Sequence, residues 1–174
     1  DILNAELTRQ DVSELDLEIT KTENGFRASV NHAQLVAGNE TQLTMMVMEH
    51  GKTMPEGVYN PGGDHRDRVV VGLAECAVDN ATVLTSIGLL GASVSDGCES
   101  SFSIEFEALS SWSVVLIHEP TSATLTEGAD AQSHGAVELA FRDRAEPVQA
   151  ASGVGTLLLV TCGALAVASI VRKK

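Results

Sequence analysis

Two methionines and a histidine in the middle of the chain have the residue types of a soft-metal site. Met46, Met48 and His50 alternate along a strand-like segment, so their side chains are expected to share one face. Met54 follows in the next predicted loop. Thioether and imidazole groups suit Cu(I), because both are soft or borderline ligands. The pattern is one that a copper-binding module would use. We expect no cofactor, and copper is the only one that the sequence suggests as an alternative. The alternative is that the methionines fill a core poor in aromatic side chains.

The segment around these residues resembles a known type of copper-handling domain. Residues 35–54 are similar to a strand pair of the CopC and YtkA-like periplasmic domains, which are β-sandwiches. The resemblance covers this segment alone and includes no specific spacing. Those domains typically have a histidine at the mature N-terminus, whereas this chain begins Asp1-Ile2-Leu3. The resemblance therefore implies copper handling for the methionine and histidine set only.

The remaining polar residues do not form a catalytic motif. Residues 64–68 are a charged segment in a predicted loop, which favours a solvated loop over a polar contact surface or a divalent-ion site. His118 and His134 stand alone, as structural or solvent-facing histidines often do. No zinc-protease, nucleophile-elbow, P-loop or dinucleotide-binding motif is present in the sequence. We therefore expect a protein that is not an enzyme, with no catalytic residues.

Alternating apolar and polar residues predict strands along most of the chain. Residues 14–20 place three apolar side chains on one face, and residues 26–30 resume the alternation after Asn24-Gly25, a typical hairpin turn. Residues 101–108 alternate in the same way. Residues 136–141 are expected to form a final strand.

Four other runs are apolar at both odd and even positions: residues 43–48, 68–73, 83–90 and 112–118. Such runs are typical of central strands that are buried on both faces. About nine short strands separated by turn signals predict a mainly β fold, an Ig-like antiparallel β-sandwich.

The C-terminal part of the chain has the pattern of a membrane anchor. Residues 147–171 carry no charge, and Arg172, Lys173 and Lys174 follow at once. A helix of about 20 apolar residues crosses a bilayer, and flanking basic residues favour the cytoplasmic side. The chain begins with Asp1 rather than Met, which fits removal of a signal peptide. These features predict a single-pass type I membrane protein, although a buried core helix is the alternative.

Small residues recur along the predicted membrane helix. Gly155, Cys162, Ala166 and Ser169 fall on one helical stripe. Small side chains let helices approach closely in lipid, so the stripe is expected to pack against another membrane helix. The alternative is that alanine and glycine are simply common in membrane spans.

The charge of the chain limits its partners. The net charge is −13, and all 24 acidic residues lie before residue 147 together with eight of the 11 basic residues. So acidic a domain is unsuited to nucleic acid or to an anionic lipid surface. We therefore expect its partners to be other membrane protein subunits, with the lipid bilayer holding the anchor.

Two cysteines and two sequence triplets fit an exported domain. Cys76 and Cys98 are the only cysteines before the anchor, and a disulfide between them is expected in an oxidising compartment. Asn39 and Asn80 each begin an Asn-x-Thr glycosylation triplet. Free thiols and chance triplets are the alternatives.

These inferences together define the expected organisation. An N-terminal arm or short helix (residues 1–12) precedes an extracytoplasmic β-sandwich (13–144), a juxtamembrane linker (145–152), a transmembrane helix (153–171) and a cytoplasmic basic tail (172–174). The predicted function is that of an accessory or structural subunit of a membrane protein complex, or of a surface component. The alternatives are a membrane-anchored copper-binding module and a viral envelope or spike protein. The compartments that fit are the ER lumen, the cell surface, the periplasm and the virion surface.

Overall fold

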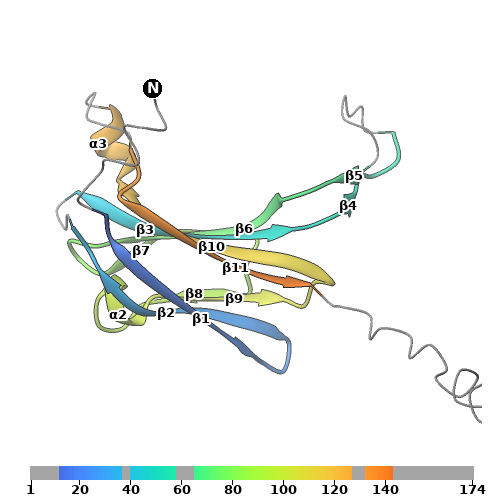
Figure 1. Cartoon of the computed structure of the whole chain (residues 1–174), viewed down its shortest axis with the longest axis horizontal. Coiled ribbons are helices and arrows are strands. Elements are labelled where there is room, and N and C mark those ends of the chain that lie inside the picture. The colour runs from blue at the N-terminus through green and yellow to red at the C-terminus, as the bar shows by residue number, and fades with distance from the viewer. Residues whose placement is uncertain (1–11, 37–39, 58–64, 127–131, 143–174) are drawn as a thin grey trace, which may run out of the picture. The chain divides into compact units, whose positions relative to one another are not determined.

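A computed structural model describes residues 12–36, 40–57, 65–126 and 132–142. These residues belong to one compact unit that spans Asp1–Arg142. The fold is mainly β, with antiparallel sheets stacked as two layers (Figure 1).

The lower layer in Figure 1, called sheet A, contains four strands. Its order is β1 (Glu14–Lys21), β2 (Gly25–Gln34), β9 (Ser103–Glu107) and β8 (Gly91–Ser93). The predicted hairpin is present, because Lys21 at the end of β1 pairs with Phe26 in β2. Every neighbouring pair in this sheet is antiparallel.

The upper layer, called sheet B, contains five antiparallel strands. Its order is β11 (Gly135–Arg142), β10 (Ser111–Pro120), β3 (Thr41–Glu49), β6 (Val69–Ala77) and β7 (Thr82–Ile87). Two further strands, β4 (Lys52–Thr53) and β5 (His65–Arg66), pair with each other and form what we call the arm. The arm and the short helix α3 (Ser122–Thr126) rise at opposite ends on the outer side of sheet B (Figure 1).

The core lies between the two sheets and follows the predicted alternation. Phe102, Ile104 and Phe106 from the β9 segment are all buried against residues of sheet B. Trp112 of β10 is only 1% exposed. Its ring contacts Phe26, Phe106 and Phe141, with ring centroids 4.8, 5.0 and 5.3 Å away. Trp112 and these three phenylalanines therefore form one aromatic cluster.

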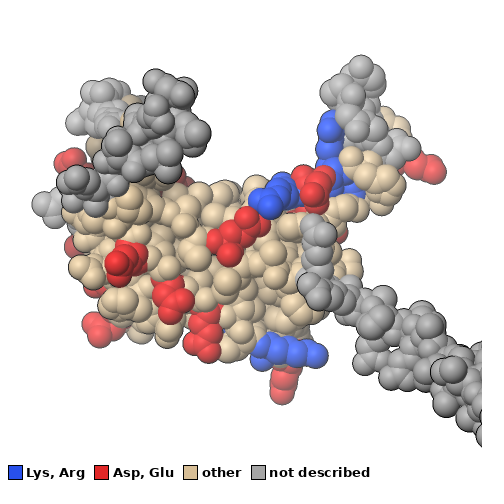
Figure 2. Space-filling view, viewed as in Figure 1, with Lys and Arg blue, Asp and Glu red and all other residues tan. Residues whose placement is uncertain are grey.

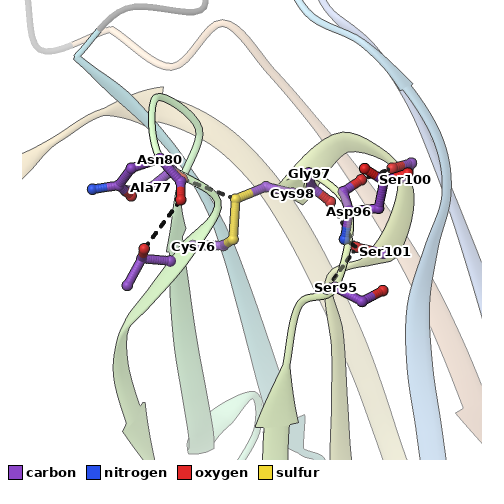
Figure 3. Close-up of a disulfide and its surroundings, with 10 residues drawn as sticks. Cys76, Ala77, Asn80, Ser95, Asp96, Gly97, Cys98, Ser100 and Ser101 are labelled. Carbon is purple, nitrogen blue, oxygen red and sulfur yellow. Dashed lines mark hydrogen bonds between the residues drawn. A yellow bond between two sulfur atoms is a disulfide. The ribbon is translucent and has the colours of Figure 1, made fainter.

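The predicted disulfide between Cys76 and Cys98 is confirmed. Cys76 lies in β6, Cys98 begins the short helix α2 (Cys98–Ser101), and their Cα atoms are 5.9 Å apart. Figure 3 shows that the bridge joins the strand of sheet B to the helical turn that precedes β9. Both cysteines are completely buried, so the bond links the two layers inside the core.

The four runs that are apolar at both odd and even positions have two different outcomes. Three of them contribute β3, β6 and β10, which are indeed the central strands of sheet B. The expectation for residues 83–90 is wrong, because β7 is an edge strand and Leu84, Ile87 and Leu90 are at least half exposed. The predicted loop around residues 64–68 also differs, since His65 and Arg66 form β5 and pair with β4. Apolar composition alone does not distinguish a central strand from an uncharged edge.

The predicted membrane helix and its flanking segments lie outside the described residues. So do Asn39 and residues 1–11 of the N-terminal segment that was predicted to be an arm or short helix. Within the described ranges, no helix combines the length and apolar character needed to cross a membrane.

Candidate functional site

An apolar row crosses the outer face of sheet B, on the side away from the core. Val115 of β10 pairs with Met46 of β3, Met46 pairs with Leu73 of β6, and Leu73 pairs with Ile87 of β7. Directly paired residues project to the same side of a sheet. None of these four side chains belongs to the core cluster or packs against it. They therefore form a continuous apolar strip across four strands.

Neighbouring residues widen this strip into a patch. The row on one side contains Met48 and Val70, which pair with each other, and the row on the other side contains Ile117. Val70 and Ile87 are 50% and 66% exposed, and the other apolar members are half-buried. We call this surface the outer patch; its members are Met46, Met48, Val70, Leu73, Ile87, Val115 and Ile117. No described element covers it between the arm and α3 (Figure 1).

A hydrogen-bonded polar cluster borders the outer patch at the α3 end. Gln42 Nε2 lies 3.3 Å from a carboxylate oxygen of Glu75 and 3.3 Å from one of Glu119. Thr44 Oγ1 donates to the same oxygen of Glu119 at 2.6 Å. Gln42 and Thr44 are buried beneath this cluster. The amide and hydroxyl groups thus hold two carboxylates at the edge of the apolar surface.

A second polar cluster borders the outer patch at the base of the arm. His50 Nε2 lies 2.9 Å from Ser113 Oγ, and His50 Nδ1 lies 3.6 Å from Asp67 Oδ1. Arg68 Nη1 contacts Glu138 at 3.1 Å. Asp67 also accepts from the backbone N–H of Gly51 at 3.3 Å. These contacts fasten both strands of the arm to the sandwich.

A hydrogen bond from Ser113 and the neighbouring Arg68 guanidinium lower the pKa of Glu138 below its ordinary value of 4.5, against a smaller opposing effect of desolvation. The Ser113 hydroxyl therefore lies near both the Glu138 carboxylate and His50 Nε2, and it interacts with both groups.

The pKa of Glu138 gives a prediction about stability at low pH. A carboxyl whose pKa is lower in the folded state contributes stability above its unfolded pKa, and this contribution is lost as the pH falls. Glu138→Gln should therefore be less stable than the wild type at pH 7, and the difference should shrink as the pH falls below 4.5. Denaturant unfolding of both chains at pH 7 and pH 3.5 measures this difference. A gap of equal size at both pH values would contradict the assignment.

The order of hydroxyl, imidazole and carboxylate in Ser113, His50 and Asp67 is that of a hydrolase triad, but its environment is different. Ser113 is completely buried, and it interacts with the Glu138 carboxylate as well as with His50. Asp67 is 65% exposed and lies beyond hydrogen-bond distance of the imidazole. A nucleophile must be reachable by a substrate and activated by its base. The geometry instead suits a structural fastening of the arm.

The predicted copper residues lie on one side of the sandwich. Met48 pairs with Ser113, whose hydroxyl contacts His50, so Met46, Met48 and His50 share the outer face of sheet B as expected. Met54 is half-buried just after β4. Both ring nitrogens of His50 face protein groups, so ligation of Cu(I) would require it to leave Ser113 or Asp67. Among the described residues, no group of three or more His, Cys, Asp or Glu residues is placed to hold a metal ion.

The other predicted site residues are scattered. His118 is completely buried with its Nδ1 2.7 Å from Ser13 Oγ, and its ring lies 4.9 Å from that of His134, which fits a structural role. Asn80 is exposed in the turn before β7, where a glycan would be accessible. Its modification stays a prediction. Gly155, Cys162, Ala166, Ser169 and the basic tail lie outside the described residues.

Comparison with protein-family models, curated proteins and solved structures finds no match for this chain.

Sequence reasoning missed the outer patch as a surface. It identified Met46 and Met48 as chemical candidates, but assigned Val70, Leu73, Val115 and Ile117 to strands buried on both faces. The available signal was the apolar character at both odd and even positions of three runs. That signal indicates that the outer face of these strands is suited to burial. In the structure, no described element packs on that face.

Proposed function

We propose that this chain is a single-pass type I membrane protein with a non-catalytic, Ig-like β-sandwich outside the cytoplasm. It acts as an accessory or structural subunit of a membrane protein complex, or as a surface component. The observation that carries the proposal is the outer patch, a row of apolar side chains across four strands of sheet B. Soluble monomers rarely expose large contiguous apolar patches, and those that do use them for binding.

The polar groups around the outer patch also support binding over chemistry. Glu75 and Glu119 accept hydrogen bonds from Gln42, and the hydroxyl of Ser113 interacts with His50 and Glu138. Such satisfied polar groups bordering an apolar centre are typical of a protein interface.

The compartment and the anchor of this proposal come from the sequence. A disulfide inside the core is typical of domains in oxidising compartments. A buried disulfide that joins a strand of sheet B to the helical turn before β9, together with a tryptophan in the core, is similar to the arrangement in Ig-like sandwiches. The uncharged residues 147–171 and the three cations that follow support the membrane helix and its orientation.

The proposal predicts that Leu73→Glu will release the chain from its complex. A carboxylate in the centre of the outer patch would have to be desolvated on binding, which costs several kcal/mol when no cation accompanies it. Native mass spectrometry of the full chain, extracted from its own membrane in mild detergent, should show an assembly for the wild type and the free chain for the variant.

Leu90→Glu is the matched control. Leu90 is 50% exposed, but its backbone N–H bonds to Glu105 of sheet A, away from the outer patch. Its assembly should keep the wild-type mass. A Leu73→Glu variant that retains every partner would exclude the outer patch as the interface. A copper mass that disappears when Met46, Met48 and His50 are replaced together would instead support the metal-binding alternative.

A further inference from the structure

We propose that this chain binds a small amphiphilic anion, a carboxylate on a single apolar chain, in a recess between the edges of its two sheets. The recess is separate from the outer patch, because Trp112 and its other core residues lie on the opposite side of sheet B. The inference therefore does not depend on the proposed function. It is argued from the strands that form the recess, the apolar surface inside it and the polar groups at its wall.

The recess lies where the two sheets have neighbouring edges. Strand β1 is an edge of sheet A and β11 is an edge of sheet B, and both run from the α3 side towards the arm side (Figure 1). The edges are joined where the strands begin, because the N–H of Ser13 donates to the carbonyl of His134 at 2.8 Å. Nearer the ends of the strands, a recess of about 420 Å³ has Ile19 of β1 and Leu139 of β11 in its lining. The sandwich is thus closed at one end of this side and open at the other.

Apolar side chains that face the core are exposed in the recess. Leu139 and Phe141 pair with Val114 and Trp112, which are both buried in the core. Directly paired residues project to the same side of a sheet, so Leu139 and Phe141 also point inward. They are nevertheless 38% and 41% exposed. An apolar chain that covered this surface would bind favourably, because it would remove the surface from water.

The recess extends into the aromatic cluster of the core. Phe26 and Trp112 contribute to its lining, and Trp112 is only 1% exposed. Sites for small molecules are mostly apolar and have volumes upward of about 300 Å³. A volume of about 420 Å³ lies at the small end of this range. The recess is therefore suited to one short chain rather than to a large ligand.

The polar side chains of the lining are both hydrogen-bond donors. They are Lys21 and Trp112, and the described lining residues supply no carboxylate or other acceptor side chain. Lys21 pairs with Phe26, so it lies on the core side of β1, and its exposed ammonium group has no partner among the described side chains. Trp112 Nε1 is buried, likewise without a partner there. Such a wall favours a ligand that brings acceptor atoms, and Lys21 favours an anionic one.

Charge also argues against a cationic ligand. Aromatic rings such as those of Phe26, Trp112 and Phe141 bind quaternary ammonium groups in other sites, but Lys21 would repel such a group here. Glu138, the acidic residue of β11, pairs with Val115 of the outer patch and therefore projects away from the recess. The net charge of −13 opposes any anion at long range, so burial of the apolar chain must supply most of the affinity.

The test uses Trp112 as its own reporter, because it is the only tryptophan in the chain. A bromine atom quenches indole fluorescence when it touches the ring. Octanoate with bromine on its terminal carbon is therefore added to the full chain in vesicles of phosphatidylcholine, which contain no tryptophan. The fluorescence of Trp112 should fall to a plateau as the probe saturates the recess. Bromide ions at the same concentration should quench little, since Trp112 is 1% exposed.

Matched probes and Lys21 variants test the choice of head group. The same brominated chain ending in an alcohol or in a trimethylammonium group should bind more weakly than the carboxylate. Lys21→Met should weaken binding of the carboxylate about threefold, as expected for an exposed ion pair, and leave the alcohol unchanged. Lys21→Glu should make the ammonium probe bind more tightly than the carboxylate. Lys52→Met is the control, because Lys52 lies in β4 and does not line the recess.

Filling the recess should block all three probes. Leu139→Phe places a larger side chain at a position that is 38% exposed, so the fold can accommodate it. Ile19→Phe fills the recess from the β1 side and serves as the second filling variant. Each should weaken binding at least tenfold while the melting temperature shows that the chain still folds. Leu73→Glu changes only the outer patch and should bind the probes as the wild type does, so this inference and the proposed function fail independently.

Four results would overturn the inference. The first is quenching that never saturates or that bromide ions reproduce, and the second is tight binding that both filling variants retain. The third is equal affinity of the carboxylate for the wild type, Lys21→Met and Lys21→Glu. The fourth is a wild-type chain that prefers the ammonium probe, which would make the recess an aromatic site for cations.

Discussion

Replacing Trp112 with alanine should lower the free energy of unfolding by about 3–5 kcal/mol, the usual cost of removing a large aromatic side chain from a core. Trp112 is 1% exposed and contacts the rings of Phe26, Phe106 and Phe141. It also borders a recess of about 420 Å³ that Ile19 and Leu139 line as well. Truncation would enlarge this recess and remove the centre of the aromatic cluster. Denaturant unfolding of the full chain, followed by circular dichroism, measures the loss.

Trp112→Phe is the matched control for this prediction. The Trp112 Nε1 atom is buried and has no hydrogen-bond partner among the described residues, so phenylalanine removes no such bond. It keeps a ring among the neighbouring aromatic side chains. Its loss of stability should therefore be well under half of that of the alanine variant. Equal losses would mean that the indole makes an interaction beyond its packing.

Removing the disulfide should have the second largest effect on stability. Replacing both Cys76 and Cys98 with alanine opens a loop with a sequence separation of 22 residues. In the chain-entropy model, such a loop contributes about 3 kcal/mol by restricting the unfolded chain. The melting temperature should fall by roughly 10 °C for a domain of this size. Thermal unfolding under non-reducing conditions measures this shift.

The disulfide prediction has a control in the third cysteine. Cys162→Ser lies in the predicted membrane helix and leaves the bridge between Cys76 and Cys98 intact, so the melting temperature should stay at the wild-type value. A reducing agent should reproduce the effect of the double alanine variant on the wild type and have no effect on that variant. A melting temperature insensitive to both changes would show that the bridge does not constrain the unfolded chain.

The same bridge bears on the outer patch. The loop that it closes begins near the end of β6, just after Leu73 and Glu75, and it contains β8 and also β7, which carries Ile87. The bond therefore restrains one side of the outer patch and reduces the ordering cost of binding. Association through the outer patch should weaken when the bridge is absent, even at temperatures where the sandwich stays folded.

Much of the sandwich could be predicted from local pattern. Strict alternation identified β1, β2 and β9, because a half-buried strand needs one apolar face and one polar face. The turn at Asn24-Gly25 and the pairing of Cys76 with Cys98 were also predictable. In the first case turn chemistry limits the residue types, and in the second no other cysteine precedes the predicted anchor.

Which apolar faces are covered depends on how the sheets pack. The residue pattern alone shows that β3, β6 and β10 have apolar side chains on both faces, which predicts central strands. Met45 lies inside the core and its neighbour Met46 lies outside it, although both are methionines in one run. The side on which each one falls depends on which sheet packs against which face, and that is set by contacts between residues far apart in the chain. For the same reason, no local sequence pattern predicts that Ser113, His50 and Asp67 meet at the base of the arm.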